Sequence, residues 1–166
     1  TWDANVLPTS ATANHLGSWS TDFYIPSATK GPHFVGVVGN TTDTSEIDKM
    51  EFMLTLFAKV EPTSGPVGAN ISIRAFGFRP NEDGITIIWD RKIIVCNLIA
   101  ATDGIFNTTL RIPPSSAGRH VLGIYGSDFT PIGVIPDTDF DVTPNIELQP
   151  ASGIKGTETN VVGTGF

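Results

Sequence analysis

The chain carries two copies of one Pro- and Gly-rich pattern, and this internal repeat limits its fold more than any other feature. The first copy, VEPTSGPVGANISIRAFGF, spans Val60–Phe78, and the second, LQPASGIKGTETNVVGTGF, spans Leu148–Phe166. Six residues recur at a spacing of 88: Pro62, Ser64, Gly65, Gly68, Gly77 and Phe78 correspond to Pro150, Ser152, Gly153, Gly156, Gly165 and Phe166. Turn-forming residues at fixed offsets over so long a period predict a tandem array of domains.

The N-terminal third also has a counterpart further along, at a spacing of 87. The matched residues are Trp2-Asp3 with Trp89-Asp90, Gly17 with Gly104, Ile25-Pro26 with Ile112-Pro113, Gly31 with Gly118, His33 with His120, Gly36 with Gly123 and Gly39 with Gly126. From Phe52 and Phe140 onward the spacing is 88, so the loop between gained or lost one residue. We therefore expect an incomplete repeat in residues 1–59, a complete one in 60–149 and the first strands of another in 150–166.

The segments between the turn residues have the pattern of short strands. ANISIRAF, residues 69–76, alternates apolar and polar side chains, as a half-buried strand does. RPNEDG, residues 79–84, is a loop of turn-forming residues. Further along, RKIIVCNLIAAT, residues 91–102, is predicted to be two short strands or one bent strand. Asp103-Gly104 predicts a hairpin. Since helical apolar spacing is absent, about seven strands per unit favour an all-β, Greek-key immunoglobulin-like sandwich.

Several of these motifs together carry a resemblance to a known class of domains. P-x-S-G-x-x-G, a strand that ends in G-F, then DG-x-F, IPPSSAGRH and a final F-x-V resemble the immunoglobulin-like repeats of bacterial and archaeal surface proteins. The opening segment is similar to the start of IPT/TIG domains, and Trp89 and Trp2 lie where such sandwiches keep a buried Trp. The resemblance covers nearly the whole chain. It implies an extracellular or cell-surface, non-catalytic module, by analogy of fold.

The two partial repeats complement each other. Residue 1 corresponds to position 88 of the complete unit and residue 166 to position 78. A sandwich that lacks a strand exposes apolar side chains and unpaired backbone groups, so we do not expect residues 1–59 to fold alone. We predict that an assembly strand completes them, in a neighbouring molecule, by strand donation. Its residues are Glu158, Thr159, Asn160, Val161, Val162, Gly163, Thr164, Gly165 and Phe166. The alternative is a fragment trimmed from a longer array.

Charge and hydropathy argue against nucleic acid as a partner and against a membrane-spanning segment. The net charge is −7 and the lysines and arginines are scattered, so a nucleic-acid partner is not expected. No apolar run reaches the length that crosses a bilayer. A signal peptide is not visible and the chain begins at Thr1, so we expect a mature product or an excised fragment. The expected partners are copies of the chain itself or neighbouring repeats of the same array.

Catalytic constellations are not recognisable in the sequence, and neither enzyme activity nor a cofactor is predicted. His33 and His120 occupy equivalent positions, each on the apolar face of a strand, and are expected to be packed, hydrogen-bonded structural residues. Asp3 and Asp90 recur beside the two tryptophans and are interpreted as strand-end caps. The lone cysteine, Cys96, has apolar neighbours and is expected to be a small core or edge residue.

Two kinds of surface site remain as hypotheses. Asp137, Asp139 and Asp141 alternate along one strand, with Phe140 opposite, and could hold calcium through hard oxygen ligands. A solvated acidic strand is the alternative, and the first copy lacks the acidic residues at this place. Three N-x-S/T triplets begin at Asn40, Asn70 and Asn107 and are candidate glycosylation sites in an exported protein.

The sequence leaves two functions open. The first is a structural component of a filament or surface layer, joined by strand exchange between its repeats. The second is a binding module: an adhesin, or the carbohydrate-binding accessory domain of a larger secreted protein, with a glycan or surface ligand. Trp19 and Phe23 align with Phe106 and Leu110 and are expected in the core, which leaves only Tyr24 facing outward.

Overall fold

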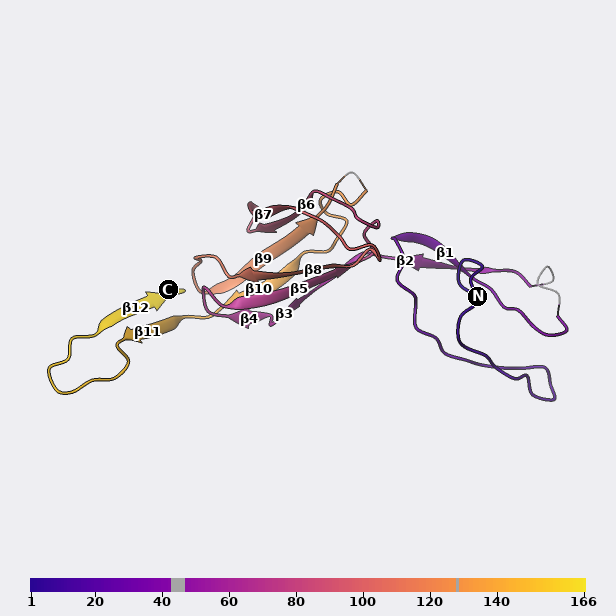
Figure 1. The fold of residues 1–166 in the computed structure, drawn as a ribbon, viewed down its shortest axis with the longest axis horizontal. Helices are drawn as coiled ribbons and strands as arrows, with labels where there is room; N and C mark the ends of the chain where they lie inside the picture. Colours follow the sequence, from indigo (N-terminus) through magenta and orange to yellow (C-terminus); the bar gives the residue numbers. More distant parts are fainter. Residues whose placement is uncertain (43–46, 128) are drawn as a thin grey trace.

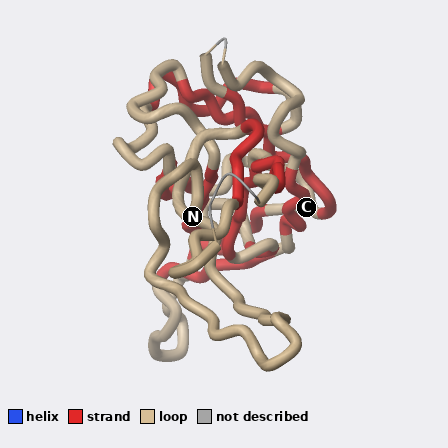
Figure 2. The backbone as a smooth tube through the Cα atoms, turned by 90° about the vertical axis from the view of Figure 1, so that its right-hand side faces the viewer, coloured by secondary structure: helices blue, strands red, loops and turns tan. Residues whose placement is uncertain are grey.

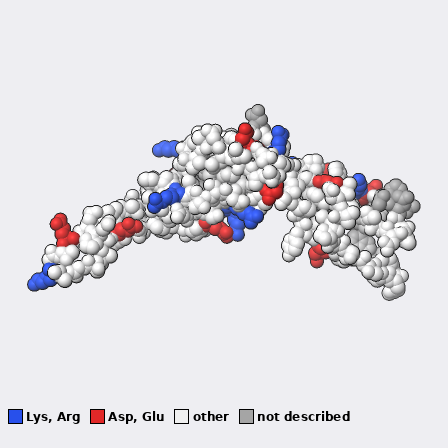
Figure 3. Space-filling view, in the orientation of Figure 1, with Lys and Arg blue, Asp and Glu red and all other residues white. Residues whose placement is uncertain are grey.

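The computed structural model describes residues 1–42, 47–127 and 129–166, and it is all-β. No helix occurs among these residues, as the tube of Figure 2 shows, so no helix that could span a membrane is present in them either. Strands and loops alternate along the chain, as the abundance of Gly and Pro predicts. Lysines, arginines and carboxylates are dispersed along the face drawn in Figure 3 rather than gathered by sign.

The central region, residues 56–142, holds two sheets (Figure 1). A five-stranded sheet has the order β4-β10-β9-β6-β7, formed by β4 (Ser64–Gly65), β10 (Thr138–Val142), β9 (Gly118–Tyr125), β6 (Ile85–Trp89) and β7 (Lys92–Leu98). A three-stranded antiparallel sheet has the order β3-β5-β8, formed by β3 (Phe57–Glu61), β5 (Asn70–Phe76) and β8 (Phe106–Arg111). Apart from the parallel β4–β10 pair, neighbouring strands are antiparallel. The arrangement is compatible with a β-sandwich.

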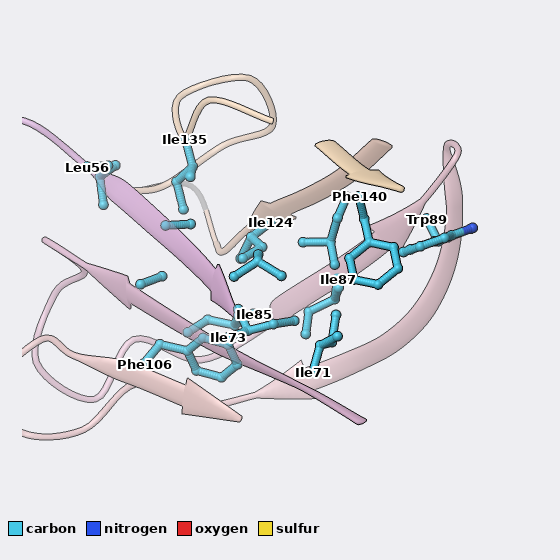
Figure 4. Packing of buried hydrophobic residues seen from close by; sticks show 14 of the residues in the cluster. Leu56, Ile71, Ile73, Ile85, Ile87, Trp89, Phe106, Ile124, Ile135 and Phe140 are labelled. Carbon is cyan, nitrogen blue, oxygen red and sulfur yellow. The ribbon is translucent and has the colours of Figure 1, made fainter. Parts of the chain in front are cut away.

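One hydrophobic core joins the two sheets. Ile71 and Ile73 of β5 are 1% and 0% exposed, and the polar residues between them face solvent, so period-2 alternation decides which face is buried. From the other sheet, Ile87 and Phe140 point toward them (Figure 4). Each buried side chain of this size contributes roughly 1.5–3 kcal/mol. The core therefore accounts for the stability of the central region.

Two further hairpins flank the central region. β1 (Gly31–Val35) pairs with β2 (Met50–Leu54) before it, and β11 (Asn145–Gln149) pairs with β12 (Asn160–Thr164) after it. Each is a two-stranded sheet of its own, and the two lie at opposite ends of the long axis of the molecule (Figure 1). We call β11–β12 the C-terminal hairpin and residues 1–54 the N-terminal segment.

The hairpin expected at Asp103-Gly104 is wrong. A turn is present there, with Gly104 at φ 74°, but it joins β7 to β8, which belong to different sheets. A side chain at residue 104 would place its Cβ 2.4 Å from the carbonyl oxygen of Phe78, so the glycine is needed for a close backbone approach. The chain crosses from one sheet to the other at this point. RKIIVCNLIAAT, in turn, forms one strand, β7, with irregular register against β6.

The core positions expected for Trp19 and Phe23 are also not observed. Trp19 is 49% exposed, and Phe23 is partly buried in a segment without strand structure. Their counterparts lie on β8, which is hydrogen-bonded to β5. Among the described residues, no strand is paired with residues 19–24. The aromatic side chains are left outside a sheet.

Candidate functional site

The N-terminal hairpin reproduces the pairing of two strands of the central sheet. β1 and β2 correspond to β9 and β10, and every residue pair has its equivalent. The matched pairs are Gly31–Leu54 with Gly118–Val142, Pro32–Met53 with Arg119–Asp141, His33–Phe52 with His120–Phe140, Phe34–Glu51 with Val121–Asp139, and Val35–Met50 with Leu122–Thr138. The repeat found in the sequence thus recurs in the hydrogen-bonded register.

The C-terminal hairpin reproduces a different pair of strands. β11 and β12 correspond to β3 and β5, again without any shift. The matched pairs are Asn145–Thr164 with Phe57–Phe76, Ile146–Gly163 with Ala58–Ala75, Glu147–Val162 with Lys59–Arg74, Leu148–Val161 with Val60–Ile73, and Gln149–Asn160 with Glu61–Ser72. Residues 145–164 are therefore built like the first two long strands of the central region.

One face of the C-terminal hairpin is apolar and uncovered. Ile146, Leu148 and Val161 are 63%, 46% and 59% exposed. Ile146 and Leu148 share a face by alternation, and Val161 lies directly opposite Leu148. Their three counterparts in the central region are no more than 8% exposed, because the second sheet covers them. Apolar side chains at equivalent positions thus form a core in one place and an open surface in the other.

Trp2 and His33 of the N-terminal segment are buried together, although the described part of this segment forms only one two-stranded sheet. Trp2 is 4% exposed and stacks on His33, with ring centroids 4.9 Å apart and an interplanar angle of 18°. The Phe52 ring is tilted against Trp2, with ring centroids 5.7 Å apart. The central region repeats the arrangement, with Trp89 stacked on His120 at 5.2 Å and 18°, and 5.7 Å from Phe140.

A carboxylate orients each histidine. The Nδ1–H groups of His33 and His120 donate to Oδ2 of Asp3 and Asp90, at 2.6 Å in both cases. Their Nε2–H groups donate to backbone carbonyl oxygens, at 2.8 Å and 2.9 Å. The second carboxylate oxygen accepts the N–H of the residue after the histidine. The two aspartates therefore do more than cap a strand, since each connects the ring to the neighbouring backbone.

The turns that present these carboxylates are also equivalent. Asp3 and Ala4 have φ of 47° and 69°, and Asp90 and Arg91 have φ of 48° and 70°. Two consecutive residues with positive φ define the tight turn that suits the twist of a hairpin. Asp is among the few non-glycine residues that enter this region readily. The Trp-Asp pair thus supplies both the buried ring and the turn that aims the carboxylate.

The hydrogen bonds raise the pKa of each histidine and lower the pKa of each aspartate. For His33, the bond to Asp3 raises the pKa above 6.5, and the same bond lowers the pKa of Asp3 below 3.8. For His120, burial lowers the pKa, but the bonds to Asp90 and to the Ser116 carbonyl raise it more, so the net direction is upward. An imidazole with both nitrogens facing oxygen acceptors satisfies both only when it is protonated. Both imidazole nitrogens of His33 and of His120 are thus used in hydrogen bonds within the protein.

The acidic strand is mostly solvated, as its alternation indicates. Phe140 is 1% exposed while Asp139 and Asp141 lie on the opposite face, and Asp139 pairs with Arg119 at 2.5 Å. Asp137 precedes β10 and borders a pocket together with Asp90 and Arg91. Within the described ranges, no three His, Cys, Asp or Glu side chains converge as metal ligands. Calcium binding stays a prediction.

The candidate glycosylation residues are all exposed. Asn40 lies in a bend, Asn70 begins β5, and Asn107 is on β8. Asn70 and Asn107 alternate with buried residues of their strands, so both face away from the core. Cys96 is likewise exposed, on β7 at the edge of its sheet, which agrees with an edge residue.

A buried carboxylate was not foreseen from the sequence. Glu82 is 4% exposed and accepts hydrogen bonds from the N–H of Arg79 and the hydroxyls of Ser127 and Thr130. It holds the loop that carries Phe129, whose ring lies 4.3 Å from the Arg79 guanidinium and 4.8 Å from Lys30 Nζ. Lys30 also donates its backbone N–H to the Gly77 carbonyl. These contacts attach the N-terminal segment to the central region.

Comparison with known proteins adds no identity. No protein-family model matches the chain, and no curated protein matches its sequence significantly. The candidate site is therefore defined by geometry alone: two hairpins correspond to different parts of the central region, and the C-terminal hairpin has an uncovered apolar face.

Proposed function

We propose that the chain is a structural assembly module of an extracellular, cell-surface or filament protein, built from tandem Greek-key immunoglobulin-like sandwiches. In this proposal residues 60–149 are the complete repeat, and residues 1–59 and 150–166 are partial repeats that complete each other between neighbouring copies. The observation that carries it is the matched register of the terminal hairpins. β1–β2 keeps the pairing of β9–β10, and β11–β12 keeps the pairing of β3–β5.

The uncovered apolar face supplies a driving force of the right size. Ile146, Leu148 and Val161 are about half exposed or more in the single chain. Because they are already about half buried, covering the rest of these three side chains contributes roughly 2.5–5 kcal/mol before the loss of translational freedom is subtracted. Backbone groups of an unpaired strand edge add hydrogen bonds on assembly. A contact that joins one end of a copy to the other end of the next is heterologous, and it propagates as a filament unless its rotation closes a ring.

Two adjacent valines of β12 test the proposal with a matched control. Val161 lies on the apolar face of the hairpin, whereas Val162 lies on the opposite face. Val161→Asp is expected to abolish concentration-dependent assembly, because a carboxylate would have to be buried. Val162→Asp, which adds the same charge, is expected to leave assembly intact. Sedimentation velocity and negative-stain microscopy over a range of concentrations measure both, and a monomeric wild-type protein at all concentrations contradicts the proposal.

A second candidate is the adhesin or carbohydrate-binding module. Trp19 is 49% and Tyr24 98% exposed on one short segment, and exposed aromatic rings are suited to stacking on sugars. Selective binding on a glycan array, lost in Trp19→Ala, would favour this function. In the assembly proposal the same substitution affects self-association instead, so the two readouts separate the candidates.

A further inference from the structure

We propose that in the assembled form β12 of one copy adds to residues 19–24 of a second copy, in the register that β5 keeps with β8. This inference rests on the proposed assembly function and names the contact that carries it. The occupant is a second copy because the C-terminal hairpin and the N-terminal segment lie at opposite ends of one molecule (Figure 1). The central region is the template, since it holds the equivalents of both partners already paired.

The template specifies which residues face each other. In the central region Ala75 is opposite Phe106, Ile73 opposite Thr108 and Ile71 opposite Leu110. Carried over by the spacings of 88 and 87, these pairs become Gly163 opposite Trp19, Val161 opposite Thr21 and Thr159 opposite Phe23. The inward positions of residues 19–23 are therefore Trp19, Thr21 and Phe23. The equivalent positions of β8 are Phe106, Thr108 and Leu110.

The volumes of these pairs are complementary. Where the central pair is Ala75 with Phe106, the exchanged pair is the smaller Gly163 with the larger Trp19. Where the central pair includes Ile71 and Leu110, the exchanged pair has the smaller Thr159 and the larger Phe23. Each enlarged side chain in one segment faces a reduced one in the other. Because cores are close-packed and tolerate volume-conserving changes best, this compensation at two of the three inward pairs favours the template register.

A second contact follows from the parallel pairing of β4 with β10. In the central region Ser64 is paired with Asp141 and Gly65 with Val142, and the N–H of Asp141 donates to the Thr63 carbonyl. The equivalents place Ser152 beside Met53 and Gly153 beside Leu54 of the second copy. One C-terminal hairpin therefore engages both the 19–24 segment and β2. The proposal covers these two contacts only, since residues 79–87 have no counterpart within the chain.

Single-cysteine proteins test the register between copies. Both carry Cys96→Ser; one also carries Thr21→Cys and the other Val161→Cys. Directly opposed strand residues lie within reach of a disulfide, so mild oxidation of the mixture, where wild type assembles, is expected to give a cross-linked heterodimer as the main product. In the control mixture Val162→Cys replaces Val161→Cys, and the side chain then points to the other face, so most of the heterodimer is expected to be lost.

A size-swap rescue gives an independent measurement without oxidation. Gly163→Ala is expected to weaken assembly about fivefold or more, because its Cβ, which also lies 3.1 Å from the Phe166 ring of its own copy, meets Trp19 of the second copy. Gly163→Ala with Trp19→Phe recreates the pair Ala75–Phe106 and is expected to restore it. Trp19 emission should also shift to the blue on assembly, since Trp2 and Trp89 are already buried.

The outcomes distinguish the register from the function. Equal cross-linking of the two mixtures, no cross-link in an assembled sample, or purely additive effects of the two size changes would each overturn the register while assembly stands. A wild-type protein that never assembles would overturn both the register and the proposed function.

Discussion

The central region and the C-terminal hairpin contain the same two strands in the same register, and they differ in what covers them. Val60 and Ile73 are 3% and 0% exposed in the central region, whereas Leu148 and Val161 are 46% and 59% exposed. Pairing is therefore specified locally, by turn and strand residues, while burial requires the second sheet. The hairpin therefore keeps its strand pairing although its apolar face is uncovered.

In the N-terminal segment, a packed side-chain cluster is kept but one of the expected strands is not formed. It keeps the Trp2–His33–Phe52 cluster of the central region with nearly identical ring geometry. Its equivalent of β8, residues 19–24, nevertheless forms no strand. Local side-chain clusters persist without the full sandwich, but strands that depend on a distant neighbour do not.

The largest expected effect tests the contrast in burial. Ile73→Ala removes a fully buried side chain and is expected to lower the free energy of unfolding of the central region by about 2–5 kcal/mol. Val161→Ala, at the equivalent exposed position, is expected to change it by less than about 0.5 kcal/mol. Urea unfolding at protein concentrations below assembly measures both. Similar losses at the two positions would show that the hairpin face is already covered in the single chain.

A smaller effect is expected at the oriented histidines. Asp90→Ala leaves the His120 Nδ1–H and the Val121 N–H without their acceptor, and we expect a loss of about 1–2 kcal/mol in the stability of the central region. Asp3→Ala removes the same two bonds in the N-terminal segment. Hydrogen exchange of Phe34 and Val121 reports each site separately. The comparison fails if Asp3→Ala destabilises the central region as much as Asp90→Ala does.

The strands of the central region were largely predictable because their side chains alternate. Ile71 and Ile73, and likewise His120 and Leu122, face the core as period 2 requires. The sequence also predicted that the partial repeats expose apolar side chains, but it placed Trp19 in the core, where it does not lie. Repeat alignment assigns Trp19 to a core, since its counterpart Phe106 is 2% exposed, but alignment does not register that the neighbouring strand is absent. An equivalent residue is buried only when its surroundings are equivalent too.

Long-range polar contacts left no signal in the sequence. Glu82 sits in a loop of turn formers, and its hydroxyl partners lie 45 and 48 residues away. Neither spacing belongs to a strand or helix period, so only the folded chain brings them together. Asp103-Gly104 failed for a related reason: the turn residues predict a reversal of the chain, but they do not determine which sheet receives the next strand.

The smallest expected effect is the pH dependence of folding stability that the two histidines contribute. It compares the central region with the N-terminal segment by testing whether His120 and His33 titrate alike. The pKa of each histidine is raised above 6.5, so protonation stabilises the folded form. This contribution is complete below pH 6.5 and is lost as the pH rises through the raised pKa. The pKa values of Asp3 and Asp90 are lowered below 3.8, so their contribution is present above pH 3.8 and is lost as the pH falls through the lowered pKa.

Stability should therefore be highest in mildly acidic solution and decline on both sides. Thermal unfolding between pH 3 and pH 9 and histidine titration by nuclear magnetic resonance measure this. His120→Gln is expected to remove most of the alkaline decline of the central region, while His33→Gln leaves it and removes that of the N-terminal segment. If both variants keep the wild-type dependence of stability on pH, the ion pair between aspartate and protonated histidine does not contribute to stability. The repeated Trp-Asp turn would then act through packing and backbone hydrogen bonds alone.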